Sequence, residues 1–161
     1  MKILVFDVET TGLPKKRKAS LDDLDNWPYI VQLSWVVYDV LEGSIESIND
    51  SVIKLPEGIS VPMESTKVHG ISNEMMLANG VDIKKQLRYF LTDAANSDLL
   101  VAHNIEFDET IISVECIRNF YNNSFNDIKT SRYCTMKKSI KRWKKWLKLE
   151  ILHEKLFDQK L

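Results

Sequence analysis

The chain is poor in the residues that cross-link or interrupt small proteins. It has two cysteines, four prolines, five glycines and three histidines among 161 residues. Cys116 and Cys134 are too few and too far apart for a disulfide framework or a cysteine-based zinc site, so we expect a reducing, cytoplasmic environment. No apolar run approaches the roughly 18 residues of a membrane-spanning helix, which argues against a membrane protein. A hydrophobic fraction of 44% suffices for one globular domain with its own core.

Acidic residues become scarce after residue 128. The net charge is −1 overall, but residues 1–128 carry 20 acidic and 11 basic side chains, whereas residues 129–161 carry 3 and 11. The stretch 137–146 interleaves lysine and arginine with two tryptophans, a pattern that can follow a phosphate backbone and stack on bases. The alternative is a helix kept soluble by its lysines, with the tryptophans packed inward.

Hydrophobic periodicity predicts a mixed α/β domain. Runs of apolar and β-branched residues favour strands, and apolar residues three or four apart favour helices. We expect strands at 2–6, 30–38, near 51–55 and at 99–102, and helices at 73–78, 82–94, through Phe107–Ile117 and at 149–156. The first three strands have the order of an antiparallel meander, and the segment after residue 122 is expected to be irregular. Strands followed by alternating helix and strand indicate a sheet with helices packed on it.

Residues 6–12, Phe-Asp-Val-Glu-Thr-Thr-Gly, directly follow a short apolar run. Residues two apart in a strand point to the same side, so Asp7 and Glu9 project together while Phe6 and Val8 face the opposite side. Adjacent carboxylates repel each other, and such a pair persists mainly when a cation neutralises it. Oxygen ligands favour hard ions such as Mg²⁺ or Mn²⁺. The alternative is a solvated strand end, and a metal site needs a third acidic group.

Asp108 is the candidate for that third group. It follows the predicted strand at 99–102 and falls in the first turn of the next helix, where the helix dipole favours an anion. If this strand lies beside the first one, Asp108 can reach Asp7 and Glu9. Three carboxylates could then hold two divalent ions, an arrangement suited to in-line attack on a phosphodiester.

Three segments together resemble the DEDD family of 3′→5′ exonucleases. They are residues 6–12, the Lys-Val-His-Gly-Ile-Ser segment at 67–72, and Ala102-His103-Asn104 with Phe107-Asp108. Within the family, the likeness is greatest to the proofreading, epsilon-type group of bacterial DNA polymerase III. The resemblance implies a ribonuclease H-like fold and two bound Mg²⁺ or Mn²⁺ ions. It also implies specific roles for residues of this chain: Asp7, Glu9 and Asp108 as metal ligands and catalytic residues, and Thr10, Thr11, Gly12, His69, Asn104 and Phe107 at the substrate.

One family motif has no clear match. Members of the His-bearing branch end in a helix with a His-x-x-x-x-Asp motif, and no such helix follows the segment at 149–157. We therefore expect one exonuclease domain over residues 1–161, truncated at its C-terminal side relative to the family. His153 and Asp158 have the required spacing and are the substitute candidates for the general base and the fourth metal ligand. The alternative is that His153 is a surface residue of an amphipathic helix.

The sequence thus predicts a metal-dependent 3′→5′ exonuclease that releases nucleoside 5′-monophosphates from DNA ends, with single-stranded DNA as partner. Two alternatives stay open. One is a catalytically impaired module that binds nucleic acid or a DNA polymerase. The other is a nuclease that trims RNA 3′ ends, because recognition of the 2′-hydroxyl depends on the shape of the pocket.

Overall fold

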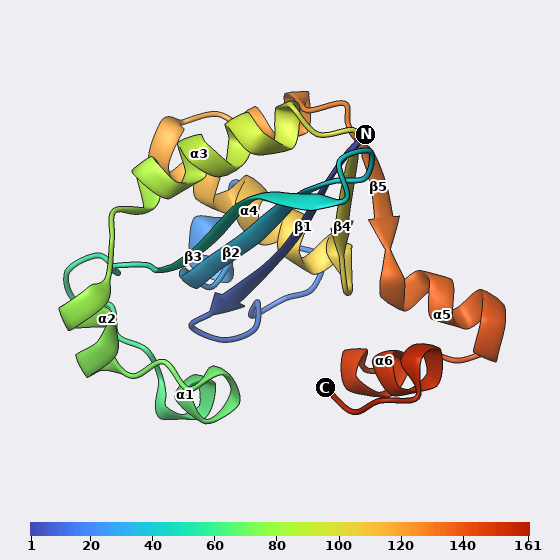
Figure 1. Cartoon of the computed structure of the whole chain (residues 1–161). Helices are drawn as coiled ribbons and strands as arrows, with labels where there is room; N and C mark the ends of the chain where they lie inside the picture. The colour runs from blue at the N-terminus through green and yellow to red at the C-terminus, as the bar shows by residue number, and fades with distance from the viewer.

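A five-stranded mixed sheet organises the chain, and the computed structural model describes all of residues 1–161 (Figure 1). The strands lie in the order β3-β2-β1-β4-β5. Their bounds are Lys2–Thr10 for β1, Ile30–Asp39 for β2, Ser44–Val52 for β3, Leu99–Ala102 for β4 and Ser131–Cys134 for β5. β1, β2 and β3 form the predicted antiparallel meander, whereas β4 runs parallel to β1 and β5 runs parallel to β4. The predicted mixed α/β class is confirmed.

Six helices accompany the sheet. They are α1 (Met63–His69), α2 (Asn73–Asn79), α3 (Ile83–Ala95), α4 (Ile105–Phe120), α5 (Thr135–Trp143) and α6 (Leu149–Phe157), with short 3-10 turns at Leu24–Asn26 and Ser124–Asp127. α3 and α4 cover one face of the sheet, while α5 and α6 extend beyond β5 (Figure 1). None of these helices has the length and hydropathy needed to span a bilayer.

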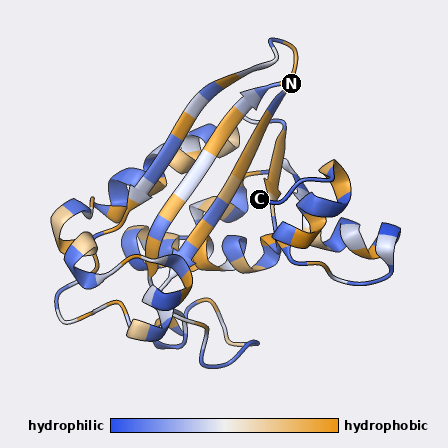
Figure 2. Cartoon of the chain, turned by 60° about the horizontal axis from the view of Figure 1, so that its bottom comes forward, coloured by the Kyte–Doolittle hydropathy of each residue, from blue (hydrophilic) through white to orange (hydrophobic).

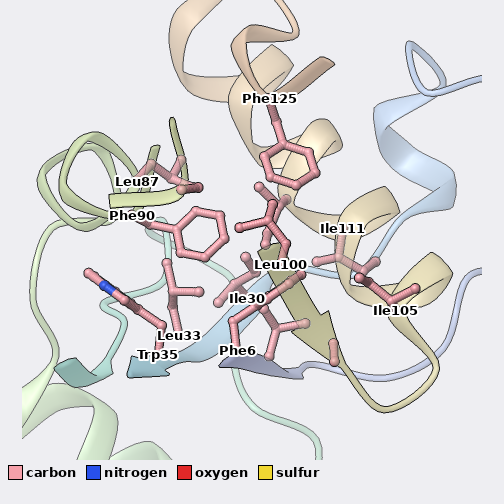
Figure 3. Close-up of a cluster of buried hydrophobic side chains, with 14 of the residues drawn as sticks. Phe6, Ile30, Leu33, Trp35, Leu87, Phe90, Leu100, Ile105, Ile111 and Phe125 are labelled. Carbon is pink, nitrogen blue, oxygen red and sulfur yellow. The ribbon is translucent and has the colours of Figure 1, made fainter. Parts of the chain in front are cut away.

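The core lies between the sheet and the helices α3 and α4. Phe90 of α3 is fully buried at its centre, with ring centroids 5.3 Å from Phe6, 5.6 Å from Trp35 and 6.0 Å from Phe125 (Figure 3). Aromatic rings at such separations add to the hydrophobic gain of burial. The Trp35 indole N–H donates to Asp93 at 2.8 Å, so the buried ring keeps a polar partner. This packing fixes β1 and β2 against the helices that carry the site.

The opposite face of the sheet is largely uncovered. Figure 2, turned to bring this side forward, shows β1, β2 and β3 with no helix lying across their length. On β1, Leu4, Phe6 and Val8 are buried in the core, as the alternation of the sequence predicts. Val5 on the other side is 45% exposed, and Asp7 and Glu9 project from that same side. The predicted carboxylate pair therefore lies on the open face.

Four elements differ from the sequence-based expectation. β3 spans Ser44–Val52 rather than residues near 51–55, and α1, β5 and α5 were not predicted. β3 is an edge strand rich in Ser, Asn, Asp and Glu, so it lacks the apolar signal of a buried strand. β5 has four residues, and α5 is a lysine-rich helix, so neither shows a long apolar pattern. The segment after residue 122, expected to be irregular, is thus partly ordered by pairing with β4.

Candidate active site

Asp108 is bonded directly to the strand that carries the other two carboxylates. Its Oδ1 accepts a hydrogen bond of 3.1 Å from the main-chain N–H of Val8, the residue between Asp7 and Glu9. The Asp108 residue is only 3% exposed, whereas Glu9 is half-buried and Asp7 is exposed. The parallel pairing of β1 with β4 brings the start of α4 to this point. The predicted approach of Asp108 to the Asp7–Glu9 pair is confirmed; the role of the three as metal ligands stays a prediction.

The turn from β4 into α4 positions Asp108. Asn104 has left-handed backbone angles, φ 68° and ψ 43°, which asparagine tolerates better than most residues. Its carbonyl accepts a hydrogen bond of 2.9 Å from the N–H of Phe107. The chain thereby reverses direction within a few residues, and Asp108 falls in the first turn of α4 as predicted.

The three carboxylates stand in an environment that disfavours their charge. Burial, followed by the negative charges of Asp7 and Glu9, raises the pKa of Asp108 to about 8 against the opposing Val8 N–H. Although the Asp7 residue is exposed, partial loss of hydration around its carboxylate raises the pKa of Asp7, and the neighbouring His103 lowers it. The pKa of Glu9 is raised by burial and then by Asp7. The site therefore holds more negative charge than its own hydrogen bonds stabilise.

The donor atoms fit a hard divalent cation. Asp7, Glu9 and Asp108 offer only carboxylate oxygens, the ligands that Mg²⁺ and Mn²⁺ prefer. A cation would also offset the mutual repulsion that raises the pKa of Asp108. The side chains do not enclose an ion as they stand, because no group of three or more Asp, Glu, His or Cys residues is arranged to do so. The chemistry of the set thus supports a metal site without defining its coordination geometry.

Hydrogen bonds of Thr10 and Thr11 stabilise the turn after β1. Thr10 is 8% exposed, and its hydroxyl donates to the carbonyl of Gly12 at 2.7 Å. The Thr11 N–H donates to the Tyr29 carbonyl at 2.9 Å, and the Thr11 hydroxyl accepts from the Tyr29 N–H at 3.0 Å. Gly12 has φ 151°, a backbone conformation that residues with a Cβ rarely adopt. The threonine side chains are therefore engaged within the fold, and their predicted contact with substrate stays a prediction.

His69 is placed against this turn by the end of α1. Its Nδ1 accepts a hydrogen bond of 3.1 Å from the Ile71 N–H, so the neutral ring carries its proton on Nε2. Nε2 is buried without a hydrogen-bond partner of normal geometry. Burial lowers the pKa of His69, and the main chain of Thr10 raises it. The structure thus brings His69 to the strand end that carries Asp7 and Glu9, with its Nε2 buried near the main chain of Thr10.

His103 lies near the carboxylates, a position that the sequence-based prediction does not include. It follows β4 directly, and its charge lowers the pKa of Asp7, which places it within electrostatic reach of the carboxylates. Its Nδ1 lies 2.9 Å from the hydroxyl of Thr135, the first residue of α5. Polar residues at the ends of neighbouring parallel strands meet at one edge of a sheet, so the rule that predicts the position of Asp108 also predicts that of His103.

Asn104 lines two hollows at the start of α4, and Phe107 lines the larger of them; none of Asp7, Glu9 and Asp108 lines either hollow. The larger, of about 1180 Å³, runs along α4 and is lined in part by Asn104, Phe107, Arg17 and Trp146. The smaller, of about 450 Å³, is lined by His103 and Asn104 on one side and by residues 146–150 on the other. The two residues predicted to contact substrate thus border space that could accept one.

His153 and Asp158 are not brought to the carboxylates. The His153 Nδ1 lies 2.9 Å from the Gln159 carbonyl, and its ring centroid lies 4.9 Å from that of Phe157. Asp158 is exposed and ends α6 with a left-handed backbone, φ 55°. Neither residue contributes to the pKa of Asp7, Glu9 or Asp108. The general-base and fourth-ligand roles predicted for them have no support from this arrangement.

Comparison with known proteins agrees with this geometry. A family model described as exonuclease matches residues 4–160. No curated protein sequence matches the chain. Among solved structures, exonuclease I of E. coli in complex with a dT13 oligonucleotide has a TM-score of 0.66 at 16% identity, covering 84% of this chain and 28% of the other. An apo exonuclease I has a TM-score of 0.69 at 15% identity, covering 87% and 30%.

The chain belongs to the exonuclease family, within the DEDD group of 3′→5′ exonucleases. Its sheet with flanking helices is the ribonuclease H-like fold of that group, as predicted. Exonuclease I from Methylocaldum szegediense has the same likeness, with a TM-score of 0.66 at 15% identity over 87% of this chain and 29% of the other. The chain thus spans less than a third of the length of these exonucleases. At such identities the structural likeness establishes the fold.

Proposed function

We propose that the chain is a metal-dependent exonuclease that removes nucleoside 5′-monophosphates one at a time from the 3′ end of single-stranded DNA. The observation that carries the proposal is the hydrogen bond between the Asp108 carboxylate and the Val8 N–H. It holds a third, buried carboxylate against the strand segment from which Asp7 and Glu9 project. Carboxylates held this close together repel one another, and a nuclease site can use them when bound cations neutralise their charge.

Asp7, Glu9 and Asp108 would hold the ions, with Asp108 as the least movable ligand because it is buried and bonded to β1. When bound, divalent ions supply Lewis-acid stabilisation of the charge that develops on the phosphodiester. The half-buried His69 lies against the Thr10–Gly12 turn with its Nε2 buried, which suits it to support the turn that would receive the terminal nucleotide. Asn104 and Phe107 line the hollow along α4 that the nucleic acid strand could enter.

A proton acceptor for the attacking water is best supplied by His103. Its ring lies within electrostatic reach of Asp7, and the Thr135 hydroxyl, 2.9 Å from Nδ1, orients the ring. When this hydroxyl donates to the Ala102 carbonyl 3.3 Å away, it accepts from the Nδ1–H of neutral His103 and leaves Nε2 free to accept a proton. General base catalysis contributes about 10²–10⁴-fold to rate. His153 keeps the spacing of the family motif and remains the second candidate.

The test is release of mononucleotides from a single-stranded oligonucleotide in the presence of Mn²⁺. We expect wild type to release nucleoside 5′-monophosphates, and the Asp7→Asn/Glu9→Gln variant to release at least a hundredfold less. Lys84→Ala, an exposed substitution on α3, is the matched control and should retain full activity. Equal release by wild type and the double variant would refute the assignment of these carboxylates.

A non-catalytic nucleic-acid-binding module is the second candidate, supported by the absence of acidic residues between Asp127 and Glu150. It predicts oligonucleotide binding that weakens with salt, with no product under any divalent ion. Running the same assay on an RNA oligonucleotide tests the RNA-trimming alternative. Association with a DNA polymerase, which the epsilon-type resemblance suggests, is tested by co-purification with a polymerase catalytic subunit.

A further inference from the structure

The segment between α5 and α6 exposes an aromatic ring among cations that have no acidic partner. Trp146 is 65% exposed. Residues 128–149 include nine lysines and arginines and no acidic residue. Two of the nine form ion pairs, Arg132 with Glu109 and Lys137 with Glu106. The other seven have none: Lys129, Lys138, Lys141, Arg142, Lys144, Lys145 and Lys148.

This basic segment begins at the candidate active site. Thr135, the first residue of α5, contacts His103, which is within electrostatic reach of Asp7. Lys137 pairs with Glu106, two residues before Asp108 in the first turn of α4. The start of α5 is therefore anchored near the carboxylates, and the helix extends from there beyond the β5 edge of the sheet (Figure 1).

Trp146 is held in place by its neighbours although its own ring is exposed. The buried hydroxyl of Ser139 accepts from the Leu147 N–H at 3.2 Å, and its own proton lies between the carbonyls of Met136 at 2.7 Å and Lys145 at 3.1 Å. Leu147 is itself only 5% exposed. These contacts of Ser139 hold the main chain on either side of Trp146, so less backbone freedom would be lost when a ligand covers the ring.

Trp146 lines two hollows that meet at Asn104, at the start of α4. Trp146 and Asn104 line both the larger hollow along α4 and the smaller one that includes His103 and Lys148. A strand that ends at the carboxylates and passes Asn104 would meet the Trp146 ring next. Its phosphates would then lie near lysines that have no acidic partner.

We propose that Trp146, Lys144, Lys145 and Lys148 form a subsite for single-stranded nucleic acid, in which an unpaired base stacks on the indole and the lysines contact the phosphates. An unpaired strand fits because stacking needs a free base face, which a duplex does not offer. The proposal rests on the proposed nuclease function for the identity of the neighbouring site. Binding itself requires no cleavage, so the two can be tested separately.

The test is binding of a fluorescent oligothymidylate of about 12 nucleotides, measured by anisotropy in EDTA over 25–200 mM salt. We expect Trp146→Ala to raise Kd at least fivefold, the lower end of a base–aromatic stacking contribution. Trp146→Phe should keep Kd within threefold of wild type because a ring remains. Lys144→Ala/Lys145→Ala/Lys148→Ala should reduce the slope of log K against log salt by about 2, since each phosphate contact on a single strand contributes about 0.7.

The matched control is Lys84→Ala/Lys85→Ala on α3, which removes exposed lysines far from this segment in the sequence and should change neither Kd nor slope. An unchanged Kd for Trp146→Ala, or a triple-variant slope equal to that of the control, would overturn the subsite. So would displacement of the oligonucleotide by polyglutamate at equal charge, because it would indicate a general site for acidic chains. Failure of nucleotide release with binding intact would count against the nuclease function alone.

Discussion

Asp108 is the residue whose surroundings are least favourable to its own charge. It is 3% exposed, its carboxylate faces two others, and the Val8 N–H is its one hydrogen-bond donor from another element. A structural protein would gain by replacing it with a neutral residue of the same shape. Its presence in the first turn of α4, buried beside Asp7 and Glu9, indicates a role that needs the charge, such as that of a metal ligand.

We therefore expect Asp108→Asn to be more stable than wild type in EDTA. The pKa of Asp108 is about 8 in the folded state, above the ordinary value of about 3.9, so the folded protein binds more protons and loses stability as pH rises between these values. The variant lacks this dependence and should gain about 0.5–2 kcal/mol at pH 8. Urea unfolding at pH 5 to 9 measures it; a stability difference that does not grow with pH contradicts the account.

At the same scale, the two candidate bases differ in their surroundings. His103 acts on Asp7, whereas His153 contacts only its own C-terminal segment. We expect His103→Ala to lower the rate of nucleotide release by about 10²–10⁴-fold and His153→Ala to change it less than threefold. Single-turnover rates at saturating Mn²⁺ separate loss of chemistry from loss of binding. The reverse ranking would restore the prediction made from the His-x-x-x-x-Asp spacing.

At the scale of elements, buried segments were predictable and edge segments were not. β1, β2, β4 and α4 have strong apolar patterns because they line the core; the sequence predicts β2, β4 and α4 close to their observed bounds, whereas β1 continues four residues past the predicted end at residue 6. β3 and β5 lie at the two edges of the sheet, and α5 presents lysines to solvent. The apolar patterns of all three elements are weak because few of their residues are buried. β3 and β5 form strands by pairing with a neighbouring strand. The elements that the sequence does not predict include α5, the lysine-rich helix that begins near the site.

α4 is fastened to the segment before β2 by a buried charge cluster. The guanidinium of Arg118 donates to the carbonyls of Leu24, Trp27 and Pro28 at 2.6–3.0 Å and pairs with Glu115 at 2.6 Å. Glu115 in turn accepts from the Ile30 N–H at 3.3 Å. The cluster thus ties the helix that carries Asp108 to the strand beside β1. The sequence pattern does not predict this cluster, because a Glu followed three residues later by an Arg is also common on exposed helices.

Removing the arginine should destabilise the fold strongly. Arg118→Met leaves Glu115 buried without its cation and three carbonyls without a donor, so we expect a loss of about 3–5 kcal/mol. Lys84→Met on the exposed side of α3 is the control and should cost less than about 0.5 kcal/mol. Chemical denaturation of the two variants gives both values. The double variant Glu115→Gln/Arg118→Met should lose less than the two single losses added, because neither charge is left alone.

At the scale of the molecule, the core fills one face of the sheet, and the candidate site lies at the strand ends and draws on both faces. The core lies under α3 and α4, and Asp108 belongs to the first turn of α4, while Asp7 and Glu9 project from the uncovered face and the basic segment leaves from the β5 edge (Figures 1 and 2). The carboxylates were predictable, because strand alternation and the parallel strand rule require only sequence positions. The contributions of His103, Trp146 and Arg118 depend on contacts between distant segments, which periodicity does not reveal.

Metal binding should stabilise the molecule through the open-face carboxylates. We expect Mn²⁺ to raise the melting temperature of wild type, because an ion that binds only the folded state at a hundred times its Kd contributes about 2.7 kcal/mol. Asp7→Asn/Glu9→Gln should lose most of that rise, whereas Lys84→Ala should keep it. Scanning calorimetry over a Mn²⁺ titration is the measurement. An equal rise in all three proteins would place the ion elsewhere.

The central claim is that these carboxylates make the chain a 3′→5′ exonuclease, and its most direct test is the product pattern from an end-labelled single strand. With a 5′ label and Mn²⁺, we predict a ladder that shortens by one nucleotide at a time, with nucleoside 5′-monophosphates as the other product. The Asp7→Asn/Glu9→Gln variant should give no ladder. A label released at once as a mononucleotide, internal cuts, or an identical ladder from the variant would contradict the account.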